Sequence, residues 1–479
     1  MKFNYNSKFM RGKNITSRNP YNILALLLLL IVCAFFGLNF PFSANAFVQS
    51  NYTFLFVGLI ICSVLLGIKL YKQPLFIFDP FLFSSLLSFC IFLIQPMNDI
   101  LKNEMFYGYM NAFSGCQKGT FVFVISYVMF CLVYFITKNK IPRHNKIYQS
   151  FKGNQFKISL ISLIIWLVSL AGCVGFFLAN GYNLSYIFTL GNLGEANIDE
   201  IFARMGFLWK FSFSLIGSFM YYWVCGHNRL LKAVMWVITC IILVANGGRA
   251  VLLIFLFAPL VYYYAKHTKN PPIRYIVMWI CVFCIISAVI QTFRWEMRSG
   301  GDVQMSMLWN MENILEPVYT NFRVYKMYYF ILDAMPGQLE YVWGKESIGY
   351  TFIMLIPRVI WPSKPDAPFR EILRYSAGDF AVENGQAFPG LTEPYMDFGL
   401  LGCLVYAFIG GWLISKLKNL YLYTHQDSHA LVLFSLLYPF LFQVIIRGYV
   451  PSLVFSVLFL FLPFIILKLI IPSSNKEKL

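Results

Sequence analysis

The sequence predicts an all-α, polytopic membrane protein with about twelve transmembrane helices and one large loop on the outer side of the membrane. Two observations carry this prediction. Of the 479 residues, 59% are hydrophobic and only 12% are charged, whereas soluble globular chains carry roughly a quarter charged residues. Apolar stretches near the ~20 residues needed to cross a bilayer also recur along the whole chain. This composition excludes a water-soluble enzyme, a nucleic-acid-binding protein and a disordered chain.

The apolar stretches give the order of the elements. We expect crossings at about 21–40, 52–71, 75–95, 119–137, 158–179, 209–226, 233–246, 250–265, 275–292, 399–415, 430–446 and 450–470. The chain then divides into three parts. Residues 1–292 hold the first nine crossings and short loops, residues 293–398 form the large, partly helical outer loop, and residues 399–479 hold the last three crossings and a polar tail.

The distribution of charge sets the orientation. The formal charge is +17, and Lys and Arg concentrate before the first crossing and in the loop at 138–157. Because cytoplasmic loops carry an excess of Lys and Arg, we expect both termini in the cytoplasm. All acidic residues except Asp79, Asp427 and Glu477 then lie on the outer side.

One alternative concerns the first crossing. Ala44-Asn45-Ala46 resembles a signal-cleavage site after a basic segment. The apolar run that precedes it is longer than an ordinary signal sequence has, so we favour an uncleaved anchor. Cleavage would leave the orientation of everything downstream unchanged.

The residue types on the outer side limit the chemistry. All five histidines fall on the cytoplasmic side, and no Asp-x-Asp pair occurs anywhere in the chain. We therefore expect no metal site and no cofactor, since the usual ligands of a Mg²⁺ or Mn²⁺ diphosphate clamp are missing. Arginines and carboxylates remain as the groups able to act there.

The outer arginines lie at membrane depth, which is costly for a charge unless it is paired or lines a wet cavity. Arg249 follows Asn246-Gly247-Gly248 in a helical hairpin that is too short to reach the outer surface of the membrane fully. Arg294 and Arg298 are four residues apart, so they share one helix face. Their alternative role is contact with lipid headgroups. Guanidinium groups bind phosphate oxygens bidentately, so a lipid-linked pyrophosphate fits this set. The candidate binding residues are Arg249, Arg294, Arg298, Arg323, Arg358, Lys364 and Arg447.

Two carboxylates precede the tenth crossing, in Phe388-Pro389-Gly390-Leu391-Thr392-Glu393-Pro394-Tyr395-Met396-Asp397-Phe398-Gly399. Pro394 suits the first position of a helix, so Glu393 should lie at a helix N-terminus, where the dipole favours a carboxylate. Glu393 is the candidate general base for a sugar hydroxyl, and Asp397, one turn later, is the second candidate. The alternative is that Glu393 only caps the helix.

At these residues the chain resembles the Wzy-type polymerases of bacterial O-antigen and related oligosaccharide repeat units. The resemblance rests on Gly247-Gly248-Arg249, on Ile356-Pro357-Arg358 with Lys364-Pro365, and on Gly390, Glu393, Phe398-Gly399 and Gly402 before the tenth crossing. It covers about 240–412 in motifs and the whole chain in its number of spans. Pro394 directly after Glu393 departs from the family pattern.

The resemblance implies a multi-pass glycosyltransferase of the bacterial inner membrane that acts on the periplasmic face. Its donor and acceptor would be oligosaccharides linked to undecaprenyl pyrophosphate in the membrane, with a chain-length-regulating co-polymerase as a further partner. Two rival functions remain. An O-antigen ligase would use the same donor but is expected to place a histidine in the outer loop, and a lipid-linked oligosaccharide flippase would not need a loop of this size.

Overall fold

The computed structural model describes most of the chain. The described residues are 20–72, 78–107, 110–137, 154–179, 208–245, 249–267, 321–356, 358, 360–378, 387–424 and 427–471, with scattered residues between 272 and 289. The predicted binding residues Arg294 and Arg298, and the side chain of Arg249, lie outside this part of the chain.

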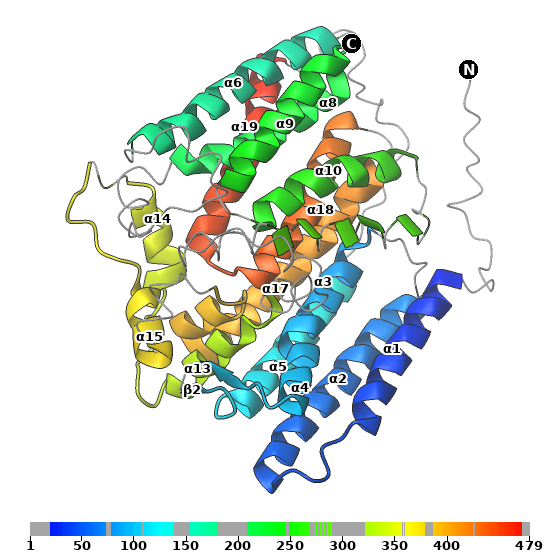
Figure 1. Cartoon of the computed structure of the whole chain (residues 1–479), viewed down its shortest axis with the longest axis vertical. Coiled ribbons are helices and arrows are strands. Elements are labelled where there is room, and N and C mark those ends of the chain that lie inside the picture. The colour runs from blue at the N-terminus through cyan, green and yellow to red at the C-terminus, as the bar shows by residue number, and fades with distance from the viewer. Residues whose placement is uncertain are drawn as a thin grey trace.

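Helices make up nearly all of the described chain (Figure 1). In the first half they are α1 (Pro20–Leu38), α2 (Ala46–Lys72), α3 (Pro80–Phe89), η2 (Cys90–Ile94), α4 (Gln95–Leu101), α5 (Cys116–Ile136), α6 (Gln155–Ala179), η4 (Leu208–Lys210), α8 (Phe211–Cys225), α9 (Arg229–Ala245) and α10 (Arg249–His267). In the second half they are α13 (Tyr325–Ala334), η6 (Lys345–Tyr350), α14 (Thr351–Met354), α15 (Pro368–Ala377), α17 (Thr392–Tyr423), α18 (Ser428–Ile446) and α19 (Val450–Ile470). The strands β1 (Phe106–Tyr107) and β2 (Met110–Asn111) form one small antiparallel hairpin.

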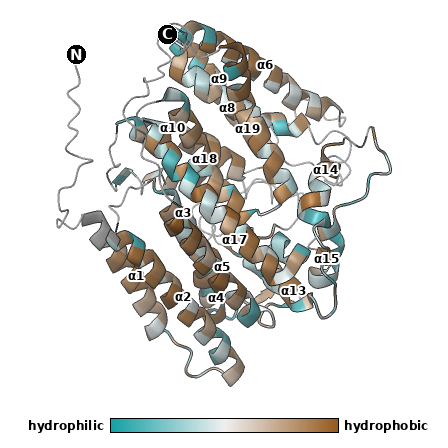
Figure 2. Cartoon of the chain, turned by 180° about the vertical axis from the view of Figure 1, so that it is seen from behind, coloured by the Kyte–Doolittle hydropathy of each residue, from teal (hydrophilic) through white to brown (hydrophobic). Residues whose placement is uncertain are grey.

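Eight helical segments of the described chain are long and apolar enough to cross a membrane. The continuous helix Pro80–Leu101, made of α3, η2 and α4, is one of them, and α17, α18 and α19 provide the last three. Many of the large apolar side chains of α1 and α2 point away from the protein, and Figure 2 shows brown, hydrophobic helices throughout the molecule. The prediction of a polytopic, all-helical membrane protein is confirmed. The full set of twelve crossings and its orientation stay predictions, and the crossing expected at about 275–292 falls mostly outside the described residues.

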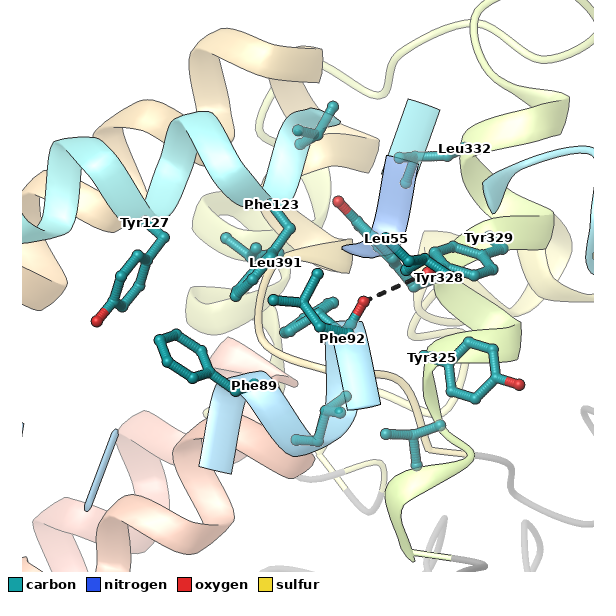
Figure 3. Packing of buried hydrophobic residues seen from close by; sticks show 14 of the residues in the cluster. Leu55, Phe89, Phe92, Phe123, Tyr127, Tyr325, Tyr328, Tyr329, Leu332 and Leu391 are labelled. Atoms are coloured by element: carbon teal, nitrogen blue, oxygen red, sulfur yellow. Dashed lines mark hydrogen bonds between the residues drawn. The ribbon is translucent and has the colours of Figure 1, made fainter. Parts of the chain in front are cut away.

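Two large apolar clusters hold the described helices together, and a third, smaller one joins α10, α17 and α18. The first large cluster lies between the helices α2, α3, η2, α4, α5, α13, α15 and the start of α17. The second lies between α6, α8, α9, α10, α18 and α19. Figure 3 shows part of the first cluster, where Phe92 and Phe123 stack with ring centroids 4.6 Å apart. Tyr329 donates a hydrogen bond to the carbonyl of Phe92 in the same place. Interlocked aromatic rings add to the apolar area that they bury.

Two apolar stretches of the predicted outer loop have different surroundings. Met327–Leu332 is buried in α13, where Tyr328 and Tyr329 are completely inaccessible. Tyr350–Ile356 instead presents exposed apolar side chains, among them Phe352 and Leu355. Hydrophobicity alone does not distinguish a stretch of the protein core from one on the surface.

One buried ion pair ties α2 to α3 near the predicted cytoplasmic side. Lys69 forms it with Asp79, and both side chains are buried. The other carboxylate oxygen of Asp79 accepts hydrogen bonds from the backbone N–H groups of Phe81 and Leu82. Asp79 therefore caps α3 and neutralises Lys69, and both are structural roles.

Candidate active site

Two loops join at the predicted outer end of the bundle and position the site. Residues 387–391 lead into α17, and residues 447–449 connect α18 to α19. The N–H of Gly390 donates to the Ile445 carbonyl at 3.1 Å, and the N–H of Gly448 donates to the Phe388 carbonyl at 3.0 Å. A Cβ atom on Gly448 would lie 2.0 Å from the Cα atom of Gly390. Only glycine permits this approach, which brings Arg447 beside the start of α17.

Glu393 lies in the first turn of α17 and is completely buried. Its Oε2 atom accepts a hydrogen bond from the backbone N–H of Val450 at 2.6 Å. Val450 is the first residue of α19, so Glu393 caps another helix and not its own. Its Oε1 atom has no hydrogen-bond partner among the described residues. The Oε2 atom thus has a structural role, while the Oε1 atom remains open to a ligand.

Asp397 is equally buried, but its carboxylate is fully occupied. The backbone N–H of Glu346 donates to its Oδ1 atom at 3.2 Å, and the N–H of Ser347 donates to its Oδ2 atom at 2.9 Å. The Ser347 hydroxyl donates to Oδ2 as well. Asp397 therefore holds the first turn of η6 against α17. This arrangement favours Glu393 over Asp397 as the proton acceptor.

Glu346 is a third buried carboxyl group in this place, and the sequence analysis missed it. Its Oε2 atom accepts a hydrogen bond from the N–H of Phe369 at 2.6 Å, and its Oε1 atom has no partner among the described residues. Burial raises the pKa of Glu346 to about 8, and the charge of Asp397 acts in the same direction, against the Phe369 hydrogen bond. Glu346 is therefore mostly neutral at pH 7.

Two further buried side-chain oxygens without partners belong to α17 and α18, the helices that the two loops of the site adjoin. Thr392 Oγ1 and Gln443 Oε1 have no hydrogen-bond partner among the described residues, and Gln443 lies one turn before Arg447. Buried polar atoms are nearly always hydrogen-bonded in proteins. Several orphaned oxygens around Glu393 therefore indicate a place where a ligand with hydroxyl donors fits.

The described cations differ in what they contact. The Arg447 side chain is exposed and has no hydrogen-bond or ion-pair partner in the described part of the chain, while its backbone N–H donates to the Gln443 carbonyl at 2.9 Å. Arg358 pairs with Asp366 and donates to the Lys364 carbonyl at 2.7 Å. Lys364 is buried and donates to the Ile356 carbonyl at 3.0 Å.

Arg323 has carboxylate partners on both sides. It pairs with Glu104 and with the completely buried Asp99, whose Oδ2 atom lies 3.4 Å from Arg323 Nε. Asp99 also accepts a hydrogen bond from the Tyr325 hydroxyl at 2.6 Å. These contacts join the start of α13 to α4, so Arg323 is held by the protein itself.

Arg358 also lies near Tyr350, the last residue of η6. Its charge acts on Tyr350, as do those of Arg370 and Glu346. Arg370 also acts on Tyr449, in the loop that carries Arg447. Of the predicted cations, the structure thus places Arg447 in the loop that packs against the start of α17, and Arg358 near Tyr350 of η6. Whether Arg249, Arg294 and Arg298 join them stays a prediction.

Glycines of the predicted motif have clear geometric roles here. At Phe398 and Gly399 the helix α17 breaks, and Gly399 has φ +60°. A Cβ atom on Gly399 would lie 2.7 Å from the ring of Tyr341, and one on Gly402 would lie 2.0 Å from the Pro394 carbonyl oxygen. The break separates the short turn that carries Glu393 and Asp397 from the long membrane helix.

The comparisons with known proteins agree with this architecture. The family model described as O-antigen polysaccharide polymerase Wzy matches residues 21–478, which is nearly the whole chain. No curated protein and no solved structure matches the chain. The match extends over all the described helices and over both loops of the site, and the chain therefore belongs to the O-antigen polysaccharide polymerase Wzy family.

Proposed function

We propose that the protein is a glycosyltransferase that polymerises undecaprenyl-pyrophosphate-linked oligosaccharide repeat units on the periplasmic face of the inner membrane. Family membership supports an O-antigen repeat-unit polymerase in a membrane. The observation that carries the finer proposal is the free Oε1 atom of the buried Glu393, at the start of α17, against which the loop with the unpaired Arg447 side chain packs. A buried carboxylate and an unpaired guanidinium on two adjoining segments suit transfer of a sugar from a pyrophosphate.

The reaction forms one bond and breaks one. The hydroxyl oxygen of the acceptor sugar bonds to the anomeric carbon of the donor, while the bond from that carbon to the pyrophosphate oxygen breaks. The electron pair of the broken bond leaves with undecaprenyl pyrophosphate, and the hydroxyl proton goes to Glu393. Negative charge develops on the pyrophosphate, where a guanidinium stabilises it. This route needs no metal and no cofactor.

The residues share this work in a definite way. Arg447 is the cation closest in the chain to the residue that Glu393 caps, and Arg358, Lys364, Arg249, Arg294 and Arg298 complete the pyrophosphate site in this proposal. Arg323 contributes by fixing α13, through Asp99 and Glu104. Asp397 positions η6 and with it Glu346. A co-polymerase that sets chain length remains the expected protein partner.

Transport is the rival function from another class, and the buried acids speak against it. Transporters use ionisable residues inside the membrane as moving charges or relays. Here Asp79 is paired with Lys69, and Asp99 is held by Tyr325 and Arg323. Deleting the gene distinguishes the functions, with the surface glycan resolved by gel. A polymerase deletion leaves single repeats on the acceptor, a ligase deletion leaves none, and a transporter deletion stalls the units inside.

The direct test of the site is Glu393→Gln. The amide oxygen keeps the hydrogen bond from Val450, so we expect the variant to fold and insert normally. Polymerisation of purified lipid-linked repeats should fall by about 10²–10⁴, the usual contribution of a general base. The matched control is Glu340→Gln, at an exposed position of the same predicted loop. Near-parental polymerisation by purified Glu393→Gln would remove Glu393 from the mechanism.

A further inference from the structure

A separate hollow lies on the predicted outer side, between β2, α13 and α15. Helices α13 and α15 pack side by side (Figure 1), and β2, from a distant part of the chain, lines the same hollow. The hollow has a volume of about 330 Å³, which is within the usual range of small-molecule sites, about 300–1,000 Å³. Three of its lining residues, Phe330, Ala334 and Ser376, are buried in the protein.

The rim of the hollow carries a mixture of hydrogen-bonding groups. The polar lining residues are Asn111, Ser114, Asp333, Gln338, Tyr375 and Ser376. Asp333 and Gln338 are exposed, and no hydrogen bond within the described chain occupies their side chains. The Oδ1 atom of Asn111 accepts from the N–H of Phe113 at 2.9 Å, so its amide N–H groups remain as donors. Carboxylate, amide and phenol together offer both donors and acceptors.

The charge of the lining selects the kind of ligand. Among the described residues that line the hollow, Asp333 is the acidic one, and none is Arg, Lys or His. The nearby ammonium group of Lys118 is already bound by the carbonyls of Leu332 and Met335. A phosphate or pyrophosphate is therefore disfavoured. A polyhydroxylated, uncharged or amine-bearing ligand fits better, since its hydroxyls pair with the amides and the carboxylate.

An aromatic face adds to this selectivity. The side chain of Tyr375 is 56% exposed at the wall of the hollow. An exposed ring beside several polar groups supplies the apolar face and polar tip that amphipathic ligands need. A sugar ring is such a ligand, with C–H groups on one face and hydroxyls around its edge.

The side chain of Tyr395 links the candidate active site to the hollow by a hydrogen bond. The Tyr395 hydroxyl donates a hydrogen bond to the Met335 carbonyl at 3.3 Å. Met335 follows Ala334 of the hollow directly, and Tyr395 is two residues from Glu393. We propose that the hollow is a saccharide subsite, which holds a sugar of the glycan away from the bond being formed. This inference rests on the proposed function, because it names the substrate part that binds outside the reacting centre.

The test uses the full-length protein in nanodiscs. The probe is the free oligosaccharide released by mild acid from the cell's own lipid-linked repeats, which lacks the pyrophosphate. We expect it to bind the parent protein, as measured by saturation-transfer NMR and titration. Asp333→Ala, Gln338→Ala and Tyr375→Ala should each weaken binding by about fivefold or more, the effect of losing one hydrogen bond or contact. The control variants Glu340→Ala and Glu371→Ala change neighbouring exposed acids outside the hollow and should bind normally.

Each outcome decides something different. Lack of binding by the parent at millimolar saccharide, or unchanged binding by all three hollow variants, would overturn the subsite. Displacement of the saccharide by inorganic pyrophosphate would overturn it too, because the hollow would then be an anion site. The proposed function is tested separately, by measuring whether the parent protein polymerises lipid-linked repeats. Glu393→Gln should lose polymerisation but keep saccharide binding, so the two ideas fail independently.

Discussion

At the scale of single residues, arginines of the same predicted role have different surroundings. The Arg447 side chain is exposed without a partner in the described chain, whereas the Arg323 side chain contacts Asp99 and Glu104. We expect Arg447→Lys to lower the polymerisation rate about tenfold or more, because a point charge does not reproduce the bidentate fork. Thermal stability should be unchanged, since no protein contact is lost. The rate is measured with purified lipid-linked repeats.

Arg323→Ala provides the contrasting variant. Removal of a partly exposed ion pair should cost on the order of 1 kcal/mol of stability. The polymerisation rate for each folded molecule should stay near the parental value. An equal loss of rate in Arg323→Ala and Arg447→Lys, at parental stability, would contradict this prediction. It would mean that the contacts of Arg323 with Asp99 and Glu104 do not give it a different role from Arg447.

The buried Glu346 gives a prediction on pH. Its pKa is about 8 in the folded protein, well above that of an exposed glutamate. Below pH 4 both the folded and unfolded states are protonated, so the full stability is present. As the pH rises towards 8, the unfolded state loses this proton first, and the stability of the parent falls. Glu346→Gln should remove this loss, because an amide does not titrate.

The measurement is the melting temperature of both proteins between pH 5 and pH 9. The melting temperature of Glu346→Gln should exceed that of the parent by a gap that widens up to about pH 8 and then stays constant. Each unit of pKa shift corresponds to about 1.4 kcal/mol, so the gap should be readily seen. Glu340→Gln, at an exposed position, should show no gap. A constant difference across the whole pH range would show that Glu346 is not buried as described.

At the scale of elements, the break in α17 determines where the carboxylates lie. Gly399 has φ +60° and no room for a Cβ atom beside the Tyr341 ring. We expect Gly399→Ala to lower stability by about 1–3 kcal/mol and to abolish polymerisation, because the turn with Glu393 must move. In Gly410→Ala, later in the same helix, the nearest contact is an ordinary 3.7 Å to the ring of Phe130. That variant should be as stable as the parent or more so. Activity and melting temperature are measured for both.

The elements also show what the sequence was able to predict. Apolar runs of sufficient length located α2, α5, α6, α18 and α19, because the bilayer demands long apolar helices whatever their neighbours. Helix-capping rules predicted a helix start at Pro394, two residues after the observed start of α17 at Thr392. Glu346 was missed for a physical reason. Its burial comes from η6, α15 and α17 packing together, and a single acid between polar residues carries no local signal of such contacts.

At the scale of the whole molecule, the orientation in the membrane remains to be measured. The proposed chemistry requires Glu393, Arg447 and the saccharide hollow to face the periplasm, on the side of the loop at 293–398. Single cysteines at Ser299→Cys and Asn384→Cys should then react with an impermeant thiol reagent in cells whose outer membrane alone is permeable. Ser150→Cys, in the basic loop predicted to be cytoplasmic, should react only after the inner membrane is lysed.

The native cysteines provide a background for this experiment, and the parent protein measures it. Cys116, at the predicted outer end of α5, is completely buried and should stay unlabelled in the folded protein. Protection of both Ser299→Cys and Asn384→Cys, with labelling of Ser150→Cys from outside, would invert the topology. The undecaprenyl pyrophosphate would then meet the site from the cytoplasm, and the polymerase proposal would lose its periplasmic face. Labelling as expected places the free oxygen of Glu393 on the side where the growing glycan must leave the membrane.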